Sequence, residues 1–170
     1  MDFKFVCANS LIGLDISKQE SLLPSSDLKA TLIQIRDEYY ATSNKVKKEK
    51  LQKEYTKLTH KNGLFDTEET RQLKSYQPFE TSESASFYDP ELMHGVEQFD
   101  IVIGNPPYVE VEKDKYWLDH YSEVLKGHYD LYILFYKKGA DLLLKNGVLC
   151  FITPHTFLSY SQFENLRKFL

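Results

Sequence analysis

The fold is decided at residues 99–108, which read FDIVIGNPPY. The first six residues form an apolar run rich in β-branched side chains, and such a run predicts a strand that is buried on both faces. The two prolines that follow forbid further strand pairing. The stretch therefore predicts a strand that ends at Asn105 and carries Asn105 and Tyr108 to the edge of a sheet.

The segments around this stretch alternate between strand and helix patterns. Short apolar runs predict strands, whereas apolar residues at helical spacing, or on all sides, predict helices. The predicted strands span residues 3–8, 99–104 and 148–153, and the predicted helices are a hairpin over 27–63, a covered helix over 129–145 and a last helix over 161–170. Residues 64–98 lack a clear period and predict mostly loop, and residues 109–128 predict a long loop. Strand, helix and strand in this order predict parallel pairing in an α/β fold.

Composition narrows the class of protein further. The net charge of −4 argues against a broad phosphate-gripping surface. Cys7 and Cys150 lie in apolar runs, which predicts buried reduced thiols rather than a disulfide or a metal site. No signal peptide and no membrane-length apolar run is present, so we expect a cytoplasmic protein without a membrane span. The Lys-rich stretch 45–57 contains interleaved glutamates and predicts a solvated helix face rather than a DNA contact.

Residues 105–108 are suited to holding an amine. The lone pair of an amine on a base is delocalised into the ring, so an enzyme must draw it out and direct it towards an electrophile. The side-chain carbonyl of Asn105 and the main-chain carbonyl of Pro106 can each accept one N–H, which favours a pyramidal nitrogen. Pro107 stiffens the turn, and Tyr108 can stack on the face of a base.

The motif resembles the catalytic motif of amino methyltransferases that use S-adenosylmethionine. Three longer stretches, residues 3–14, 84–113 and 130–158, resemble the modification region of large type II polypeptides (type IIG/IIS) that combine restriction with adenine methylation. The resemblance implies a partial Rossmann-like, S-adenosylmethionine-dependent methyltransferase fold. Residues 1–170 would form a fragment of one methyltransferase domain, with residues 27–63 as a helical-hairpin insertion.

The resemblance also implies roles for single residues. Asn105 and Pro106 would accept hydrogen bonds from the amine of an adenine flipped out of double-stranded DNA, Pro107 would hold the turn, and Tyr108 would stack on the base. Asn9 is the nearest match to the strand-end acid that contacts the adenine of the cofactor, from which it departs by being an amide, and Asn105 would also lie at the cofactor.

Other parts of the family pattern are expected outside this chain. None of the 7 glycines forms a Gly-x-Gly turn, so the main cofactor loop is expected before residue 1. The second base-sandwiching aromatic and the DNA-reading region are expected after residue 170. We therefore predict that residues 1–170 alone are inactive and need these N- and C-terminal parts.

Several alternatives remain at this point. Asn-Pro-Pro-Tyr also occurs in protein-glutamine methyltransferases, although these lack so long an insertion before the catalytic strand. A non-catalytic remnant or scaffold that keeps the fold is a different class of function, and a plain strand-ending turn is the simplest interpretation of the motif. Lys113 and Lys115, with Tyr116 and Trp117, are compatible equally with a DNA-backbone contact and with a lid.

Overall fold

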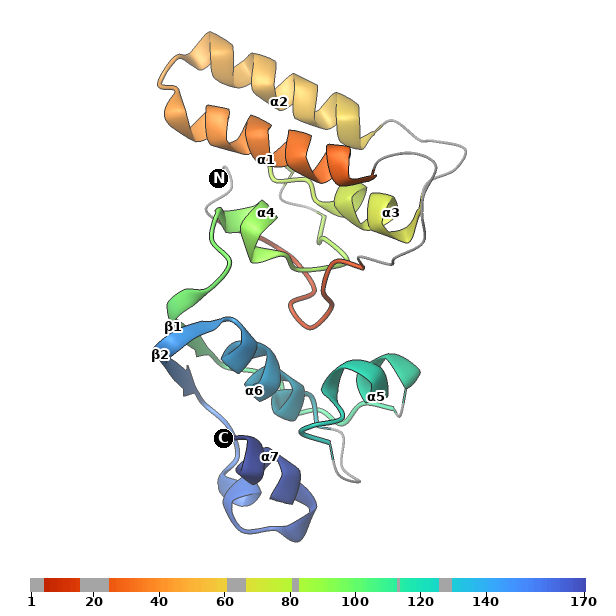
Figure 1. Cartoon of the computed structure of the whole chain (residues 1–170), viewed down its shortest axis with the longest axis vertical. Helices are drawn as coiled ribbons and strands as arrows, with labels where there is room; N and C mark the ends of the chain where they lie inside the picture. Colours follow the sequence, from red (N-terminus) through yellow and green to blue (C-terminus); the bar gives the residue numbers. More distant parts are fainter. Residues whose placement is uncertain (1–4, 16–24, 61–66, 81–82, 113, 126–129) are drawn as a thin grey trace. The chain divides into compact units, whose positions relative to one another are not determined.

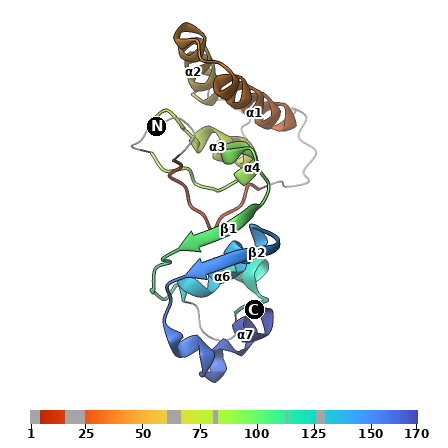
Figure 2. The ribbon, with the colours of Figure 1, turned by 90° about the vertical axis from the view of Figure 1, so that its left-hand side faces the viewer.

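The computed structural model describes residues 5–15, 25–60, 67–80, 83–112, 114–125 and 130–170. The chain divides into two compact units, residues 1–97 and 98–170, which Figures 1 and 2 draw from two sides and which are described in turn. Among the described residues, no helix has the length and apolarity needed to cross a lipid bilayer.

Helices dominate the first unit. It contains α1 (Ser25–Ala41), α2 (Lys45–Thr59), α3 (Glu68–Ser75) and α4 (Pro90–His94). Helices α1 and α2 lie side by side and are joined by a short turn (Figure 1), so the predicted hairpin is confirmed in its two helices. The Asn44 side chain begins α2 by accepting hydrogen bonds from the main-chain N–H groups of Val46 and Lys47. The predicted helix end at Asn62–Gly63 falls outside the described residues.

Side chains from all four helices form the core of the first unit. The residues of this core that are least exposed are Leu32, Tyr55, Leu73, Phe87 and Met93, each almost inaccessible to solvent. Leu32 and Tyr55 come from the hairpin, whereas Leu73 and Met93 come from α3 and α4. The hairpin therefore packs on the segment that precedes the motif in the sequence.

Three features of the first unit differ from expectation. Residues 64–98, assigned mostly to loop, also contain two short helices: α3 begins at a Thr67 cap and α4 begins at an Asp89 cap, both with side-chain hydrogen bonds to helix N–H groups. In residues 5–8 of the predicted strand only a single bridge forms, between Ala8 and Ala85. Cys7 is exposed there rather than buried, because one bridge provides no second layer to cover it.

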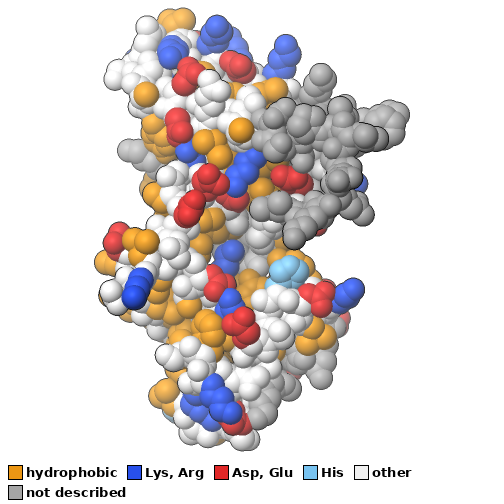
Figure 3. All heavy atoms as spheres, in the orientation of Figure 1, with side chains coloured by type: hydrophobic (Ala, Val, Ile, Leu, Met, Phe, Trp, Pro, Cys, Tyr) orange, Lys and Arg blue, Asp and Glu red, His pale blue; other side chains and the backbone are white. Residues whose placement is uncertain are grey.

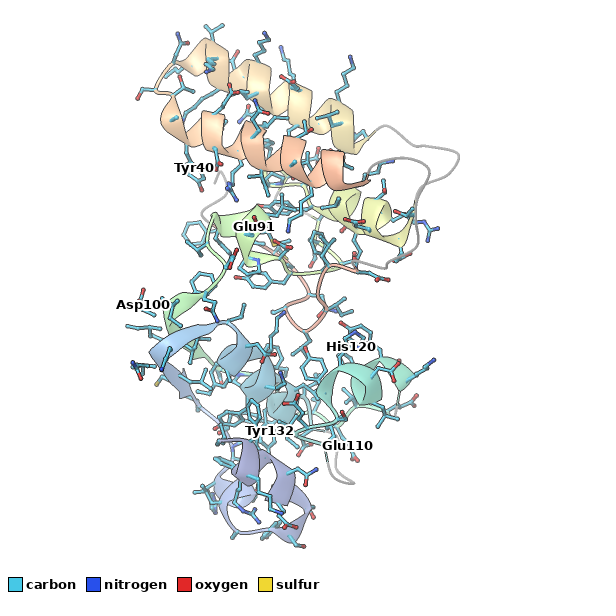
Figure 4. All side chains as sticks on the ribbon, viewed as in Figure 1. Tyr40, Glu91, Asp100, Glu110, His120 and Tyr132 are labelled. Atoms are coloured by element: carbon cyan, nitrogen blue, oxygen red, sulfur yellow. The ribbon has the colours of Figure 1, made fainter. Side chains whose placement is uncertain are left out.

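Two cations tie α1 to α4. The Arg36 guanidinium is almost completely buried and donates to the carbonyl oxygens of Glu91 and Leu92 at the end of α4. The Lys29 ammonium contacts the Asp89 carboxylate at 2.9 Å and the Glu91 carboxylate at 2.8 Å; Figure 4 labels Glu91 on α4. These contacts raise the pKa of Lys29, although burial opposes the shift. They fix the short α4 helix, which could not persist alone.

The second unit contains a parallel pair of strands. Strands β1 (Phe99–Gly104) and β2 (Leu143–Phe151) pair in parallel, and α6 (Leu131–Asp141) connects them and lies against the sheet (Figures 1 and 2). The parallel pairing is confirmed. A cluster of short helices follows the sheet: η1 (His155–Leu158), η2 (Ser161–Phe163) and α7 (Glu164–Phe169). The prediction of a last helix within 161–170 is therefore confirmed.

The start of β2 and the loop before α6 differ from expectation. Asn146–Gly147 was interpreted as a helix end, but both residues lie inside β2, where Asn146 has a positive φ of 70°. The pairing shifts there, because Phe99 faces Leu143 whereas Ile101 faces Val148. Residues 109–128 were predicted to be loop, but they contain α5 (Lys115–Tyr121), which the Asp114 side chain caps.

Only one face of the two-stranded sheet is covered. Ile101 and Ile103 of β1 and Val148 and Cys150 of β2 are exposed, whereas Leu149 packs towards α6. The prediction that both strands are buried on both faces is therefore wrong for the described residues, as is the prediction of a buried Cys150. An apolar run reports that a strand is suited to a core, not how many layers cover it.

Charges of both signs mix on the surface of the hairpin. In Figure 3 the Lys and Arg side chains over α1 and α2 are interspersed with Asp and Glu. One cross-helix pair joins Lys47 to Glu38 at 3.3 Å. The mixture agrees with the interpretation of residues 45–57 as a solvated face.

Candidate amine-binding site

The motif begins where β1 stops hydrogen-bonding as a strand. The last pair of the sheet is Gly104 with Phe151, and the Ile152 N–H donates to the Gly104 carbonyl at 3.2 Å. Because the strands are parallel, their carboxyl ends meet at one edge of the sheet. Asn105 therefore lies beside Ile152, in the position where α/β proteins place ligands.

A side chain immediately before Asn105 would crowd Phe151. A Cβ atom at Gly104 would lie 2.9 Å from a ring carbon of Phe151, which is closer than packed carbon atoms approach. The Phe151 side chain occupies this space and supports the end of the sheet from the side of α6.

Asn105 and Tyr108 both lie at the surface. Asn105 is exposed, and Tyr108 retains 49% of its exposure. The Tyr108 hydroxyl oxygen lies 3.0 Å from Asn105 Oδ1 and 2.6 Å from the Ile152 carbonyl oxygen. Pro106 is buried and Pro107 is exposed. The structure thus brings the side chains of Asn105 and Tyr108 together, and neither points into a packed interior.

A buried tyrosine stands behind Tyr108. The ring of Tyr132, at the start of α6, meets the Tyr108 ring edge to face, with 6.3 Å between centroids and an angle of 88°; Figure 4 labels Tyr132. Only 1% of Tyr132 is exposed, and its hydroxyl lies near Thr156 without a hydrogen bond of ordinary geometry. Burial raises the pKa of Tyr132 to about 12. The side chain therefore stays uncharged and supports the Tyr108 ring by packing alone.

The residues after the motif are tied to the start of α6. The Leu131 N–H donates to the Val109 carbonyl at 2.9 Å, and Glu110 forms an isolated antiparallel bridge with Asp130. Figure 4 labels Glu110 next to this end of α6. Both ends of the motif are therefore fixed, one on β2 and the other on α6.

Helix α5 carries an aromatic cluster. The Tyr116 ring stacks on His120 with 4.1 Å between centroids, and it meets Trp117 at 5.1 Å; Figure 4 labels His120. Lys115 is exposed at the first turn of this helix, and Lys113 is outside the described residues. The three aromatic side chains therefore form one contact cluster on this helix.

Asn9 belongs to the first unit. Its N–H donates to the Ala85 carbonyl at 2.9 Å, and its Oδ1 accepts from the Leu11 N–H at 3.3 Å. The side chain is exposed and closes a local turn through its oxygen. A hollow of about 230 Å³ elsewhere in this unit is lined by residues that include Val6, Cys7 and Tyr76 but not Asn9.

Sequence reasoning missed two partners of the motif. The Ile152 carbonyl is a main-chain group and has no residue-type signature. Tyr132 lies in the predicted helix 129–145 but was not assigned to the motif, and its aromatic side chain one helical turn before Tyr136 was the available signal. Among the described residues, no cluster of His, Cys, Asp and Glu is suited to binding a metal ion.

Comparisons with known proteins show which family the chain resembles. The chain is similar to the type II methyltransferase M.TthHB8I of Thermus thermophilus, with 40% identity over 44% of this chain and 20% of that protein. It is also similar to the type II restriction enzyme and methyltransferase RM.Eco57I of Escherichia coli, with 36% identity over 43% and 8%. A third relative is the modification methylase CviBIII of Paramecium bursaria Chlorella virus NC1A, with 39% identity over 43% and 19%.

These relatives are much longer than the matched region, since the chain spans at most one fifth of their lengths. The family model for the Eco57I restriction-modification methylase matches residues 9–170, almost the whole sequence. The chain therefore belongs to the Eco57I restriction-modification methylase family.

Proposed function

We propose that this chain is the amine-binding part of a DNA methyltransferase that transfers a methyl group from S-adenosylmethionine to the exocyclic amine of adenine in a restriction-modification system. Family membership and the printed names of the relatives support methylation within such systems. The choice of adenine, flipped out of double-stranded DNA, is supported by the chemistry of the motif.

The observation that carries the proposal is the position of the motif. Asn105 and Tyr108 are exposed side by side at the carboxyl edge of a parallel sheet, 3.0 Å apart at their polar atoms. A side-chain amide oxygen and the Pro106 carbonyl can each accept one hydrogen of an NH2 group, while the aromatic ring offers a face to a base. This pair of acceptors is suited to an exocyclic amine.

The residues of the motif act on the nucleophile. Asn105 and Pro106 draw the two N–H bonds to one side, so that the nitrogen lone pair leaves conjugation with the ring and points to the other side. When bound, S-adenosylmethionine supplies an electrophilic methyl group on a sulfonium sulfur. Asn105 and Pro106 would hold the amine nitrogen while it accepts that methyl group, and the nitrogen would then lose a proton to solvent. Fixed acceptors stabilise the positive charge that develops on nitrogen.

Two residues of this chain are assigned to the cofactor. The exposed amide of Asn9, with its oxygen turned to Leu11 N–H, can donate from its nitrogen to a ring nitrogen of the cofactor's adenine. Asn105 is assigned to the cofactor as well, through the resemblance of its motif to that of amino methyltransferases. The β1–α6–β2 unit supports a Rossmann-like sheet for the complete domain, with residues 27–63 as an insertion and the remaining N- and C-terminal parts of the enzyme completing the site. We place the enzyme in the cytoplasm, where its DNA substrate lies.

A methyl-transfer assay tests the proposal. We expect the polypeptide encoded by the complete reading frame around residues 1–170 to transfer tritiated methyl groups to double-stranded DNA and to leave N6-methyladenine after digestion. Asn105→Ala removes one acceptor and should lower the rate by at least about 100-fold. Gln34→Ala is the matched control, because this exposed amide lies outside the motif and donates to Glu38 on the same helix, α1.

Three outcomes contradict the proposal. Methylated cytosine in place of adenine would reject the base, and labelling of glutamine peptides but not of DNA would favour a protein-glutamine methyltransferase, which the family match does not favour. No transfer to any substrate by the complete polypeptide would indicate a non-catalytic remnant or scaffold. Residues 1–170 alone are expected to be inactive, and turnover by them would overturn that expectation.

A further inference from the structure

The Tyr108 hydroxyl has more acceptors than hydrogens. It lies 2.6 Å from the Ile152 carbonyl oxygen and 3.0 Å from Asn105 Oδ1. A phenol carries one hydrogen and two lone pairs, so it cannot donate to both oxygens at once. The contact with Ile152 is short even for an O–H···O hydrogen bond. The hydrogen therefore lies on the side of Ile152.

This assignment leaves two oxygen atoms facing each other at Asn105. With the hydrogen directed to Ile152, the Tyr108 oxygen presents a lone pair to Oδ1, and two acceptors at 3.0 Å without a hydrogen between them repel. A half-turn of the Asn105 amide replaces Oδ1 by Nδ2, which can donate to that lone pair. The two orientations occupy the same space and differ only in hydrogen bonding.

We propose that the Tyr108 hydroxyl sets the orientation of the Asn105 amide: it donates to the Ile152 carbonyl, accepts from Asn105 Nδ2, and so turns Asn105 Oδ1 outwards. Tyr108 is then a positioning residue through its hydroxyl, in addition to any stacking by its ring. The functional meaning rests on the proposed function, since an outward oxygen is the acceptor that a target amine needs, whereas an outward NH2 group would oppose it.

The surroundings hold the hydroxyl in this position. The Ile152 N–H donates to the Gly104 carbonyl at 3.2 Å, while the Ile152 carbonyl accepts from Tyr108. Ile152, the residue directly after β2, thus bonds both to the residue before Asn105 and to the residue at the end of the motif. The edge of the buried Tyr132 ring supports the Tyr108 ring from behind. Moving the hydroxyl away would break this closed set of contacts.

Side-chain amide exchange tests the orientation in the 170-residue chain without DNA or cofactor. The two Nδ2 hydrogens of Asn105 can be assigned in a nitrogen-15 NMR spectrum by their loss in Asn105→Ala. We expect one of them to exchange with solvent about three- to tenfold more slowly than those of Asn44, an exposed residue whose amide oxygen, not its nitrogen, accepts from the start of α2. Equal rates in the wild-type chain would overturn the proposal.

Two variants provide a second test by the same exchange measurement. Tyr108→Phe should raise the slow exchange rate of Asn105 to the level of Asn44, because Nδ2 loses its acceptor. Tyr136→Phe is the matched control, since the Tyr136 hydroxyl contacts Thr153 Oγ1 at 2.8 Å at the same end of the sheet and should leave Asn105 unchanged. An unchanged rate in Tyr108→Phe, with backbone resonances intact, means that Oδ1 faces Tyr108 and refutes the inference.

The activity assay separates this inference from the proposed function. In the complete enzyme, Tyr108→Phe should lower kcat about three- to tenfold while KM for DNA changes little, because the ring remains for stacking. Slow Asn105 exchange without methyl transfer would uphold the orientation and reject the function. Methyl transfer with fast Asn105 exchange would uphold the proposed function and reject the orientation.

Discussion

Replacing Arg36 by Met tests how the hairpin of α1 and α2 holds the segment before the motif. The guanidinium is 4% exposed and donates to the Glu91 and Leu92 carbonyl oxygens at the end of α4. Its ion pair with Asp37, at 2.6 Å, involves a carboxylate that is 61% exposed. The methionine side chain preserves most of the apolar contact but removes every donor.

The carbonyls determine the size of the effect. Glu91 keeps its hydrogen bond from the Gly95 N–H at 3.0 Å, so its loss is partial, whereas Leu92 loses a charged donor at 2.9 Å. A buried acceptor left without its partner costs about 1–3 kcal/mol. The loss of the exposed Asp37 pair adds little to the destabilisation. Because the variant no longer buries a charged guanidinium, part of the cost is offset. We expect a loss of about 3 kcal/mol of unfolding free energy.

Two optical probes make the assay specific. Urea unfolding of the chain is followed by circular dichroism, which is dominated by helices, and by fluorescence of Trp117, the single tryptophan, which belongs to the second unit. Arg36→Met should lower the circular-dichroism midpoint and leave the fluorescence midpoint nearly unchanged, since all its partners lie in the first unit. Lys47→Met breaks an exposed pair. It should change the unfolding free energy reported by either probe by no more than about 0.5 kcal/mol. Equal midpoints for the two variants would refute the reasoning.

Two further predictions use the same unfolding assay. Gly139→Ala should destabilise the second unit by about 1–3 kcal/mol, because the added carbon would lie 2.7 Å from Leu149 Cδ1 in the contact between α6 and β2; Gly13→Ala, where it meets nothing within 4 Å, should be nearly neutral, and equal effects would contradict this packing. Burial lowers the pKa of His94 below 6.5, so the unfolded chain binds this proton more readily and stability falls as the pH drops below 6.5 towards the folded pKa. The midpoint should decrease between about pH 7.5 and about pH 5.5, and His94→Gln should reduce that decrease; an unaltered decrease would refute the assignment.

The sequence was sufficient for the elements with strong periodic signals. The β-branched run of β1 and the two helices of the hairpin could be predicted because each pattern extends over several residues. The shorter α3 and α4 were missed, although both carry local start signals. Thr67 accepts from the Thr70 N–H at 3.2 Å, and Asp89 precedes Pro90 and accepts from the Leu92 N–H at 2.8 Å. A helix-capping residue helps to predict a short helix only when it is given as much weight as hydrophobic periodicity.

The start of β2 shows a conflict between local and tertiary signals. Asn146–Gly147 is a strong helix-ending pair by itself. In the structure Asn146 has the left-handed φ of 70° but lies inside β2, where the pairing with β1 is irregular. At Gly147 a side chain would meet the Asp100 carbonyl of β1 at 2.9 Å. The close approach of β1 is a tertiary constraint, and no local pattern could distinguish it from a helix end.

The candidate site was predictable in its residue types but not in its support. Asn105 and Tyr108 follow from the motif, whereas their anchor is the Ile152 carbonyl, which depends on the pairing of Gly104 with Phe151. Successive carbonyls along a strand point in opposite directions within the sheet. A slip of one residue would therefore turn the carbonyl beside Tyr108 away and leave its hydroxyl without the acceptor that frees a lone pair for Asn105. The orientation of one amide thus depends on the register of two strands, and a motif alone does not determine that register.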